Sequence, residues 1–406
     1  MQKINKKDKF TDIFFKIIII VLIVLSLISL SLSLILNENF FLKYSKDKKL
    51  ESETIARITN LRITLLSLEA FFLFLILIFV CFNFSIKRFI YKHKVPIQNI
   101  LLLFAVIIFL FLISEISLRI YFYDKTTSFD FGPALRFNNK YVKLNNEGFR
   151  DINHEIEKPN GTIRILGLGD SYTFAFGIKN IEDSYLEVLE KKLNKDKNYE
   201  IFNFGIPGGD IYDELLALKE KGLKYKPDII IISYSPNDYV NIDSSIKNFS
   251  FWQEIRVPFN FWLKNYFYTY FFLGIYYNKF LENIGKKQTY QDFLIEVSNS
   301  EVNEEYSREI LKEIKNIAEE SQIKVLVIAF PILYNFKNYP FSQAHNFIKD
   351  AAEKNNFYFL DLLALCEKYD EKELIVNKYD RHPNELGHRL AGEAIYEKLS
   401  YENLIP

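Results

Sequence analysis

The stretch ILGLGDSYTF, residues 165–174, joins an apolar run to two glycines, an acid and a serine. The run at 163–168 predicts a strand, and Ser171 follows where that strand ends. A dinucleotide fingerprint is excluded because it needs glycine where Tyr172 stands, and no Gly-Lys-Ser/Thr phosphate loop is present. The G-x-S-x-G elbow of another hydrolase fold is absent too. A serine in such a turn is by itself most often a turn residue, so the other strand ends must decide its role.

Short apolar runs alternate with amphipathic stretches from residue 163 onward. The runs that predict strands lie at 163–168, 199–204, 229–233, 325–330 and 357–361. They lack apolar–polar alternation, as expected for parallel strands that are covered on both faces. The intervening stretches, near 185–193, 215–218 and 310–317, predict helices. This pattern predicts an open, doubly wound α/β sheet, whose sites gather at the carboxyl ends of its strands.

Three further loops place polar groups at that edge. NFGIPGGD (203–210) follows the second strand, and its glycines allow a backbone amide to approach a ligand closely. SPND (235–238) follows the third strand, and DRHPN (380–384) precedes the final helix. A nucleophile, an amide-presenting glycine, an amide side chain and an acid–histidine pair are therefore predicted to meet.

These blocks resemble, in order and across residues 161–395, the four motifs of the SGNH hydrolases, also called the GDSL family. The preceding LNNEGFRD (144–151) is similar to the lead-in of membrane-anchored bacterial members. The resemblance implies a three-layer, flavodoxin-like domain with a mainly parallel sheet. It also implies a serine hydrolase that needs no cofactor and no metal.

The resemblance assigns roles residue by residue. Ser171 is the expected nucleophile, His382 the base and Asp380 the acid that orients it. The backbone amides of Ser171 and Gly208 and the side chain of Asn237 are the expected oxyanion hole. Each role fits the residue type, since a serine hydroxyl needs a base, and histidine titrates near neutrality. A tetrahedral oxyanion also needs donors already in place.

Two positions depart from the family pattern. The third block usually begins with glycine and here begins with Ser235, so its loop geometry is in question. The fourth block more often reads Asp-x-x-His, whereas here only Arg381 separates Asp380 from His382. The shorter spacing occurs in the branch that O-acetylates exopolysaccharides and in membrane-anchored relatives. A backbone carbonyl is the alternative orienting group.

Other residues have competing interpretations. His388 with Asp380 and His382 resembles a metal cluster, but no second ligand group is evident, and packing in the final helix is favoured. Asp170 is expected to bond amides of the nucleophile loop rather than to act as a second catalytic acid. Arg150 either binds an anionic substrate group or pairs with a carboxylate, and the sequence does not decide between them.

The first 123 residues are predicted to be a membrane region. Three apolar runs, at about 17–36, 63–86 and 97–118, have the length of spanning helices. A cleaved signal peptide would explain only the first run. Glu69 and Glu115 lie near proposed ends, which favours snorkelling to the headgroups over a functional role.

Basic residues predict the orientation of these spans. Lysines precede the first run, and the loop around 87–94 holds four basic residues without an acid, so both are expected on the cytoplasmic side. The part after residue 123 then lies on the extracytoplasmic side of a bacterial cytoplasmic membrane. Residues 124–160 are expected to be an irregular connector to the hydrolase-like domain at 161–406.

The segment at about 239–300 does not fit the strand–helix alternation, because it gathers both tryptophans and many Phe and Tyr. An inserted helical subdomain with its own apolar face is the favoured interpretation. A lid near the site, or a surface that rests on the lipid bilayer, is the alternative.

The sequence therefore predicts a membrane-anchored serine esterase that hydrolyses O-acyl esters of a cell-surface glycan or lipid. One alternative is an O-acyltransferase for an extracytoplasmic polysaccharide, supplied by a multi-spanning membrane acyltransferase. Another is a non-catalytic glycan-binding or assembly protein on the same fold. Nucleic acid is not an expected partner, since 51 basic residues balance 51 acidic ones.

Overall fold

The computed structural model describes residues 9–35, 37, 52–129, 131–194, 198–238 and 260–405. The chain divides into two compact units, Met1–Leu112 and Ile113–Pro406. The division falls inside helix α5 (Lys94–Tyr121). Leu118, in the last turn of this helix, and Phe122, which follows it, pack with aromatic residues of the second unit.

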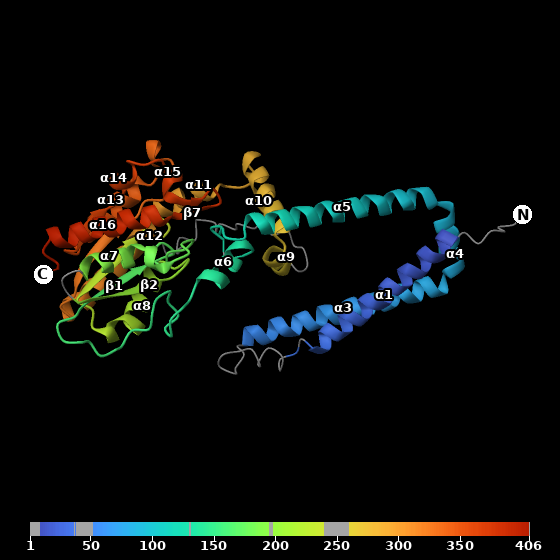
Figure 1. Cartoon of the computed structure of the whole chain (residues 1–406), viewed down its shortest axis with the longest axis horizontal. Coiled ribbons are helices and arrows are strands. Elements are labelled where there is room, and N and C mark those ends of the chain that lie inside the picture. Colours follow the sequence, from blue (N-terminus) through green and yellow to red (C-terminus); the bar gives the residue numbers. More distant parts are fainter. Residues whose placement is uncertain are drawn as a thin grey trace, which may run out of the picture. The chain divides into compact units, whose positions relative to one another are not determined.

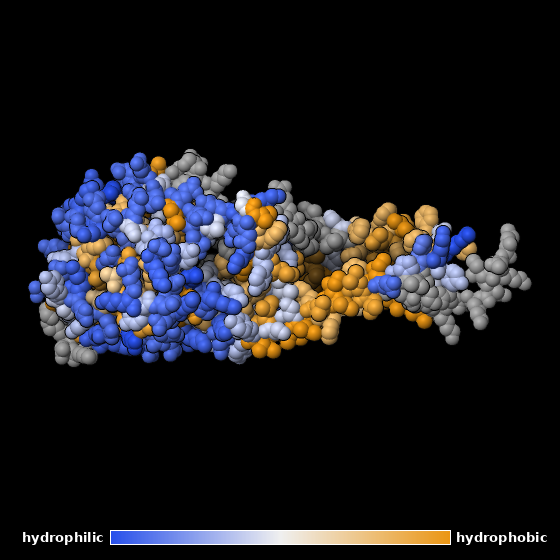
Figure 2. Space-filling view, turned by 90° about the horizontal axis from the view of Figure 1, so that it is seen from above, coloured by the Kyte–Doolittle hydropathy of each residue, from blue (hydrophilic) through white to orange (hydrophobic). Residues whose placement is uncertain are grey.

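The described residues of the first unit form the long apolar helices α1 (Lys9–Ile35) and α3 (Ser52–Cys81), the short basic helix α4 (Asn83–Lys92) and the start of α5 (Figure 1). A hydrogen bond of 2.6 Å from Ser29 Oγ to the carbonyl of Leu65 joins α1 to α3. Figure 2 shows that the surface of these helices is largely hydrophobic, whereas the surface around the sheet is largely hydrophilic. Asp12 pairs with Lys87 at 2.9 Å, so the start of α1 and the basic helix α4 lie at the same end of this unit.

Two helices in the described part of the chain are long and apolar enough to cross a membrane, Thr11–Ile35 and Asn99–Tyr121. A third crossing requires Leu65–Cys81 and α4 to count as one span, although they are bent by 82°. The continuous helix expected at 63–86 is thus broken after Cys81. Beyond the break α4 carries Lys87 and Arg88, and such charges are costly inside hydrocarbon.

The second unit contains the predicted sheet. Its five strands are all parallel and lie in the order β2-β1-β3-β4-β5. They are β1 (Ile163–Gly169), β2 (Tyr199–Gly205), β3 (Ile229–Tyr234), β4 (Lys324–Ala329) and β5 (Tyr358–Asp361). The open α/β prediction is confirmed, and β1, the first strand along the chain, lies between β2 and β3 in the sheet. Ser171 therefore follows a strand that is paired on both edges.

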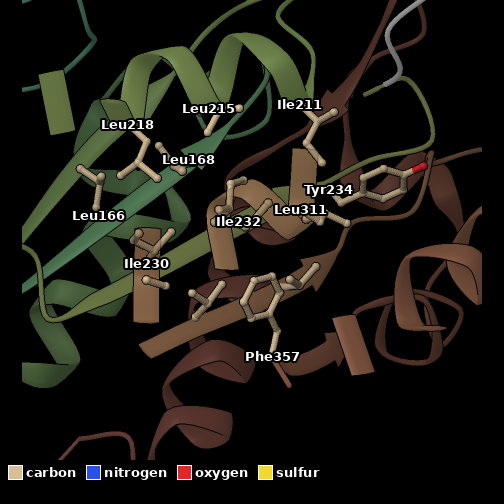
Figure 3. Packing of buried hydrophobic residues seen from close by; sticks show 14 of the residues in the cluster. Leu166, Leu168, Ile211, Leu215, Leu218, Ile230, Ile232, Tyr234, Leu311 and Phe357 are labelled. Carbon is tan, nitrogen blue, oxygen red and sulfur yellow. The ribbon is translucent and has the colours of Figure 1, made fainter. Parts of the chain in front are cut away.

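Helices cover both faces of this sheet. Alternate strand residues such as Leu166 and Ile230 pack with Leu215 and Leu311 of one helical layer (Figure 3). Residues of opposite parity, such as Ile165, pack with the other layer. The first layer holds α8 (Ile211–Ala217), α12 (Glu301–Glu320) and α13 (Ser342–Lys354), and the second α7 (Tyr185–Leu193) and α16 (Glu385–Tyr401). Burial on both faces explains why the strands read as unbroken apolar runs.

Two features differ from the sequence-based expectations. The connector is not wholly irregular, because it contains α6 (Pro133–Tyr141). Asp380 and His382 lie in a β-hairpin, β6 (Ile375–Asn377) and β7 (Asp380–Pro383), which follows the short helices α14 (Leu363–Cys366) and α15 (Glu371–Leu374). Of the aromatic segment, residues 239–259 lie outside the described residues. The remainder is helical, with α9 (Asn260–Tyr266), α10 (Tyr268–Asn283) and α11 (Tyr290–Ser298).

Glu115 does not snorkel. Its carboxylate is buried and accepts hydrogen bonds from the backbone N–H groups of Tyr268 at 3.2 Å and Thr269 at 2.9 Å. These are the first two residues of α10, whose own preceding residue, Phe267, offers no capping side chain. Arg119 completes the arrangement with a hydrogen bond of 2.7 Å to the same carboxylate. Glu115 therefore caps a helix that lies far away in the sequence.

Candidate active site

Ser171, His382 and Asp380 form one hydrogen-bonded line. Ser171 Oγ lies 2.9 Å from Nε2 of His382, and Nδ1 of the same ring lies 2.5 Å from Oδ1 of Asp380. Asp380 is fully buried, and its Oδ1 also accepts the backbone N–H of His382 at 3.1 Å. The carboxylate thus holds both the ring and the backbone of the histidine. The side chain itself, and not a backbone carbonyl, is the group on Nδ1.

The turn after β1 holds the serine at the sheet edge. Gly169 admits a close neighbour, because a Cβ there would lie only 2.0 Å from Oγ1 of Thr173. Oδ1 of Asp170 accepts the N–H of Tyr172 at 2.8 Å, and the carbonyl of Ser171 accepts the N–H of Phe176 at 2.9 Å. The turn is thus closed by its own backbone and by the adjacent acid.

Asn237 reaches the same turn from the end of β3. Its Nδ2 donates to Oδ2 of Asp170 at 2.7 Å, and that oxygen lies 3.3 Å from Ser171 Oγ. Asp170 therefore bonds a backbone amide, as expected, and in addition fixes Asn237. Ser235, noted in the sequence only as a departure, donates its hydroxyl to Oδ1 of Asn237 at 2.6 Å. The sequence offered one indication of this contact, namely a serine hydroxyl two residues before the asparagine.

Gly208 lies in the loop after β2, with φ of +72°, a conformation that favours glycine. Among the hydrogen bonds of the described residues, none joins it to Ser171. Its neighbour Gly205 makes the closer approach, since a Cβ there would meet the backbone nitrogen of Phe174 at 2.1 Å. Hydrogen bonds thus link four of the five predicted site residues, with Asp170 as the connection to the asparagine: Ser171, His382, Asp380 and Asn237. Gly208 is not part of this hydrogen-bond network among the described residues.

Arg150 has neither of its two expected roles. Its guanidinium is buried and donates to the carbonyls of Ala175 at 2.5 Å and Ile178 at 2.7 Å. Both carbonyls belong to the loop that begins at Ser171. Burial lowers the pKa of Arg150 to about 10, so the group remains charged at neutral pH. The lead-in motif GFRD therefore braces the nucleophile loop.

Other histidines lie away from this line. His388 is fully buried in α16 and accepts the N–H of Tyr185 at 3.3 Å. Burial lowers its pKa to about 3, so it is neutral at physiological pH. His345 lies 2.9 Å from Oδ1 of Asp361 and 3.1 Å from the hydroxyl of Tyr339, which ties α13 to the end of β5. Within the described residues, no group of three or more His, Cys, Asp or Glu is arranged to hold a metal ion.

Two hollows in the second unit are bounded by described residues. One of about 440 Å³ lies between the loop Ile206, Pro207, Gly208 and Gly209 and the lead-in residue Phe149. Another of about 230 Å³ adjoins Asn377 of the hairpin. Neither is lined by Ser171 or His382, which are themselves partly exposed.

A serine, a histidine and an aspartate in one line at the carboxyl edge of a parallel sheet have the arrangement of a serine hydrolase. The comparisons agree with this class. The model of the GDSL-like lipase/acylhydrolase family matches residues 168–390, which is more than half of the chain. The chain belongs to that family and is an enzyme that acts on ester bonds.

Solved structures with a similar fold include three esterases or acylhydrolases. The acetyl xylan esterase AlAXEase is 18% identical, with 58% of this chain and 98% of that chain covered and a TM-score of 0.37. A two-domain esterase (CEX) active on acetylated mannans is 17% identical, with 60% of this chain and 50% of that chain covered and a TM-score of 0.38. The lipase/acylhydrolase from Enterococcus faecalis is 15% identical, with 59% of this chain and 96% of that chain covered and a TM-score of 0.37. A search among curated proteins gives no match.

Proposed function

We propose that this protein is a membrane-anchored serine esterase that removes O-acyl groups from a cell-surface glycan or lipid. The observation that carries the proposal is the line from Asp380 through His382 to Ser171, with contacts of 2.5 and 2.9 Å. The two apolar helices support the anchor. The basic residues around 87–94 support an extracytoplasmic catalytic part in a bacterial cytoplasmic membrane.

In the first half of the reaction, Ser171 Oγ attacks the ester carbonyl carbon while Nε2 of His382 takes its proton. Asp380 keeps the ring in the tautomer that accepts at Nε2 and stabilises the imidazolium that forms. The tetrahedral intermediate then collapses. The bond to the leaving alcohol breaks, the alcohol takes the proton from His382, and an acyl-serine remains.

In the second half, water attacks the acyl-serine and gives its proton to His382. The acid leaves as Ser171 regains the proton. The oxyanion of each intermediate is stabilised by the second N–H of Asn237 and by the backbone amides of Ser171 and Gly208. The hydrogen bond to Asp170 uses one N–H of the asparagine amide and supports this role by holding the other in a defined direction.

The test is covalent labelling of the full chain with a fluorophosphonate, together with hydrolysis of p-nitrophenyl acetate. Wild type and the control Ser400→Ala, an exposed serine of α16, are expected to label and turn over equally. Ser171→Ala is expected to lose both. Labelling that survives Ser171→Ala would overturn the nucleophile assignment.

The fate of the acyl group separates hydrolysis from transfer. An esterase releases free acid when only water is present, whereas an acyltransferase keeps its acyl-serine until a sugar hydroxyl is added. Transfer outside the cytoplasm also requires a membrane partner that supplies the acyl donor. Accumulation of acylated Ser171 without acid release would therefore replace the proposal by the transferase alternative. Absence of both acyl-serine and released acid would leave the non-catalytic alternative.

A further inference from the structure

Helix α10 has two apolar faces. On one face Tyr268, Phe271 and Phe272 are buried with Phe122, the residue that follows α5. On the other face Leu273, Tyr276, Tyr277 and Phe280 are 60, 61, 45 and 56% exposed. Their spacing of three, four and seven residues places them on one stripe of the helix. A stripe of large apolar side chains on one exposed helix face marks an interaction surface.

The start of α10 lies beside the last turns of a candidate membrane span. Glu115, which caps α10, precedes the end of the apolar segment Asn99–Tyr121 by about one and a half turns, or roughly 9 Å. The N–H groups of α10 therefore meet a carboxylate that belongs to the outer part of the span. If α5 crosses the bilayer, the first turn of α10 lies at the depth of its headgroups.

Basic and aromatic groups continue this surface toward the catalytic hairpin. Lys125 lies 3.8 Å from the ring centroid of Tyr121. A hydrogen bond with Tyr379 raises the pKa of Lys378, with smaller contributions from Tyr121 and Tyr276. The ring of Tyr379 also lies 5.5 Å from that of Phe122. The tip of the hairpin thus lies among the residues at the end of α5 and the exposed stripe of α10.

We propose that the exposed stripe of α10 rests on the lipid bilayer, on the side where α5 leaves it. Tyr and Phe side chains are suited to the headgroup layer, because their rings are amphipathic or apolar and can leave water there. Lysines at the edge of such a surface attract anionic lipids. The continuity of the stripe with α5 through Glu115 and Phe122 identifies the bilayer, rather than a soluble partner, as its occupant.

One consequence rests on the proposed function. His382 lies three residues from Tyr379, which is about 10 Å along an extended strand. A hairpin whose tip touches the headgroups therefore presents its histidine and Ser171 close to the membrane surface. The substrate class is then an acyl ester that is itself held at that surface, rather than a polymer far from it.

Spin labels on the full chain in phosphatidylglycerol-containing vesicles test the docking. Cys81 and Cys366 are first replaced by serine, and a label is placed by Tyr276→Cys or, as a matched exposed tyrosine on α16, by Tyr401→Cys. The label at 276 is expected to collide several-fold more with oxygen, which concentrates in lipid, than with a water-soluble nickel chelate. The label at 401 is expected to show the reverse.

Each other outcome overturns the proposal. Equal nickel accessibility at both positions means that the stripe faces water, and shielding at 276 from both reagents means that another protein covers it. The same measurement on the Ser171→Ala chain keeps docking separate from catalysis. A lipid-exposed label at position 276 in a chain whose wild-type form shows no esterase activity would leave the docking intact and remove only the proposed function.

A kinetic measurement tests the consequence for substrate. The pair Leu273→Asp and Phe280→Asp, both at exposed positions, is expected to lower hydrolysis of a vesicle-embedded acyl ester several-fold and to leave p-nitrophenyl acetate hydrolysis unchanged. An equal loss on both esters would indicate damage to the fold, and no loss on either would contradict the surface-held substrate.

Discussion

At the scale of single residues, Ser235 changes how the departure from the family pattern is understood. Its backbone N–H donates to Oδ2 of Asp238 at 2.6 Å, and its hydroxyl donates to Oδ1 of Asn237 at 2.6 Å. Asn237 is therefore held at both ends of its amide, by Ser235 on the oxygen and by Asp170 on the nitrogen. A donor that is fixed before the reaction costs less reorganisation when the oxyanion forms.

We predict that Ser235→Ala lowers kcat without changing KM. One hydrogen bond of about 1 kcal/mol corresponds to a loss of roughly five-fold. Asn237→Ala removes a whole oxyanion donor and is expected to cost about 10²–10³ in kcat. In the double variant the Ser235 change is expected to add nothing, because its effect acts through Asn237. Steady-state kinetics of the two single variants and the double variant on p-nitrophenyl acetate measure this double-mutant cycle. Additive losses in kcat would contradict the positioning role of Ser235.

At the scale of elements, the nucleophile loop depends on a segment outside the sheet. Arg150 belongs to the connector, yet its guanidinium satisfies the carbonyls of Ala175 and Ile178. Ala175 has φ of +59°, a backbone conformation that residues other than glycine rarely adopt. A strained loop conformation persists only where surrounding contacts stabilise it, and the hydrogen bonds of Arg150 are among those contacts.

We predict that Arg150→Leu lowers the free energy of unfolding by about 1–3 kcal/mol, because it leaves buried carbonyls unpaired. Arg389→Leu, at an exposed position of α16, is expected to stay within about 0.5 kcal/mol of wild type. Thermal unfolding in detergent ranks the two variants. An equally small change in stability for both variants would show that the nucleophile loop does not need the hydrogen bonds of Arg150.

At the scale of the whole molecule, the sheet collects buried acids beneath the active site. Burial raises the pKa of Glu214 and of Asp238 well above the ordinary carboxyl range, and nearby Asp170 adds to both shifts. The folded state therefore binds these protons more tightly than the unfolded chain does. Their contribution to stability is full below the unfolded pKa and is lost as the pH rises through the folded pKa.

We predict that Glu214→Gln reduces the loss of stability on the alkaline side. Each proton bound more tightly by the folded state gives a slope of about 1.4 kcal/mol per pH unit, and the amide cannot ionise. Glu220→Gln, on the exposed surface of the next helical turn, is the control. Thermal midpoints from about pH 5 upward, where the unfolded carboxyl group is ionised, measure the slopes. Parallel curves for wild type and Glu214→Gln would exclude an uncharged Glu214 in the folded state.

Much of the fold was predictable, because its signals are local. The apolar run 229–233 predicts a strand, and the structure has β3 at Ile229–Tyr234. The turn residues around Ser171 mark the end of the neighbouring strand β1. The β6–β7 hairpin was missed because its strands are short and its turn is closed by Asn377, whose side chain accepts the N–H of Tyr379. The roles of Arg150 and Glu115 had no local signal, since their partners lie elsewhere in the chain.

For this protein the sequence by itself determined the strand–helix alternation, the apolar helices and the five residues proposed for catalysis. Hydrophobic periodicity and ordered motifs carry that information, because both depend on neighbours along the chain. Only the tertiary structure decided that Asp170 holds Asn237, that Arg150 braces the nucleophile loop and that Glu115 caps α10. Those contacts join residues from different elements, and a hydrogen bond forms wherever folding brings donor and acceptor together, whatever their separation in the sequence.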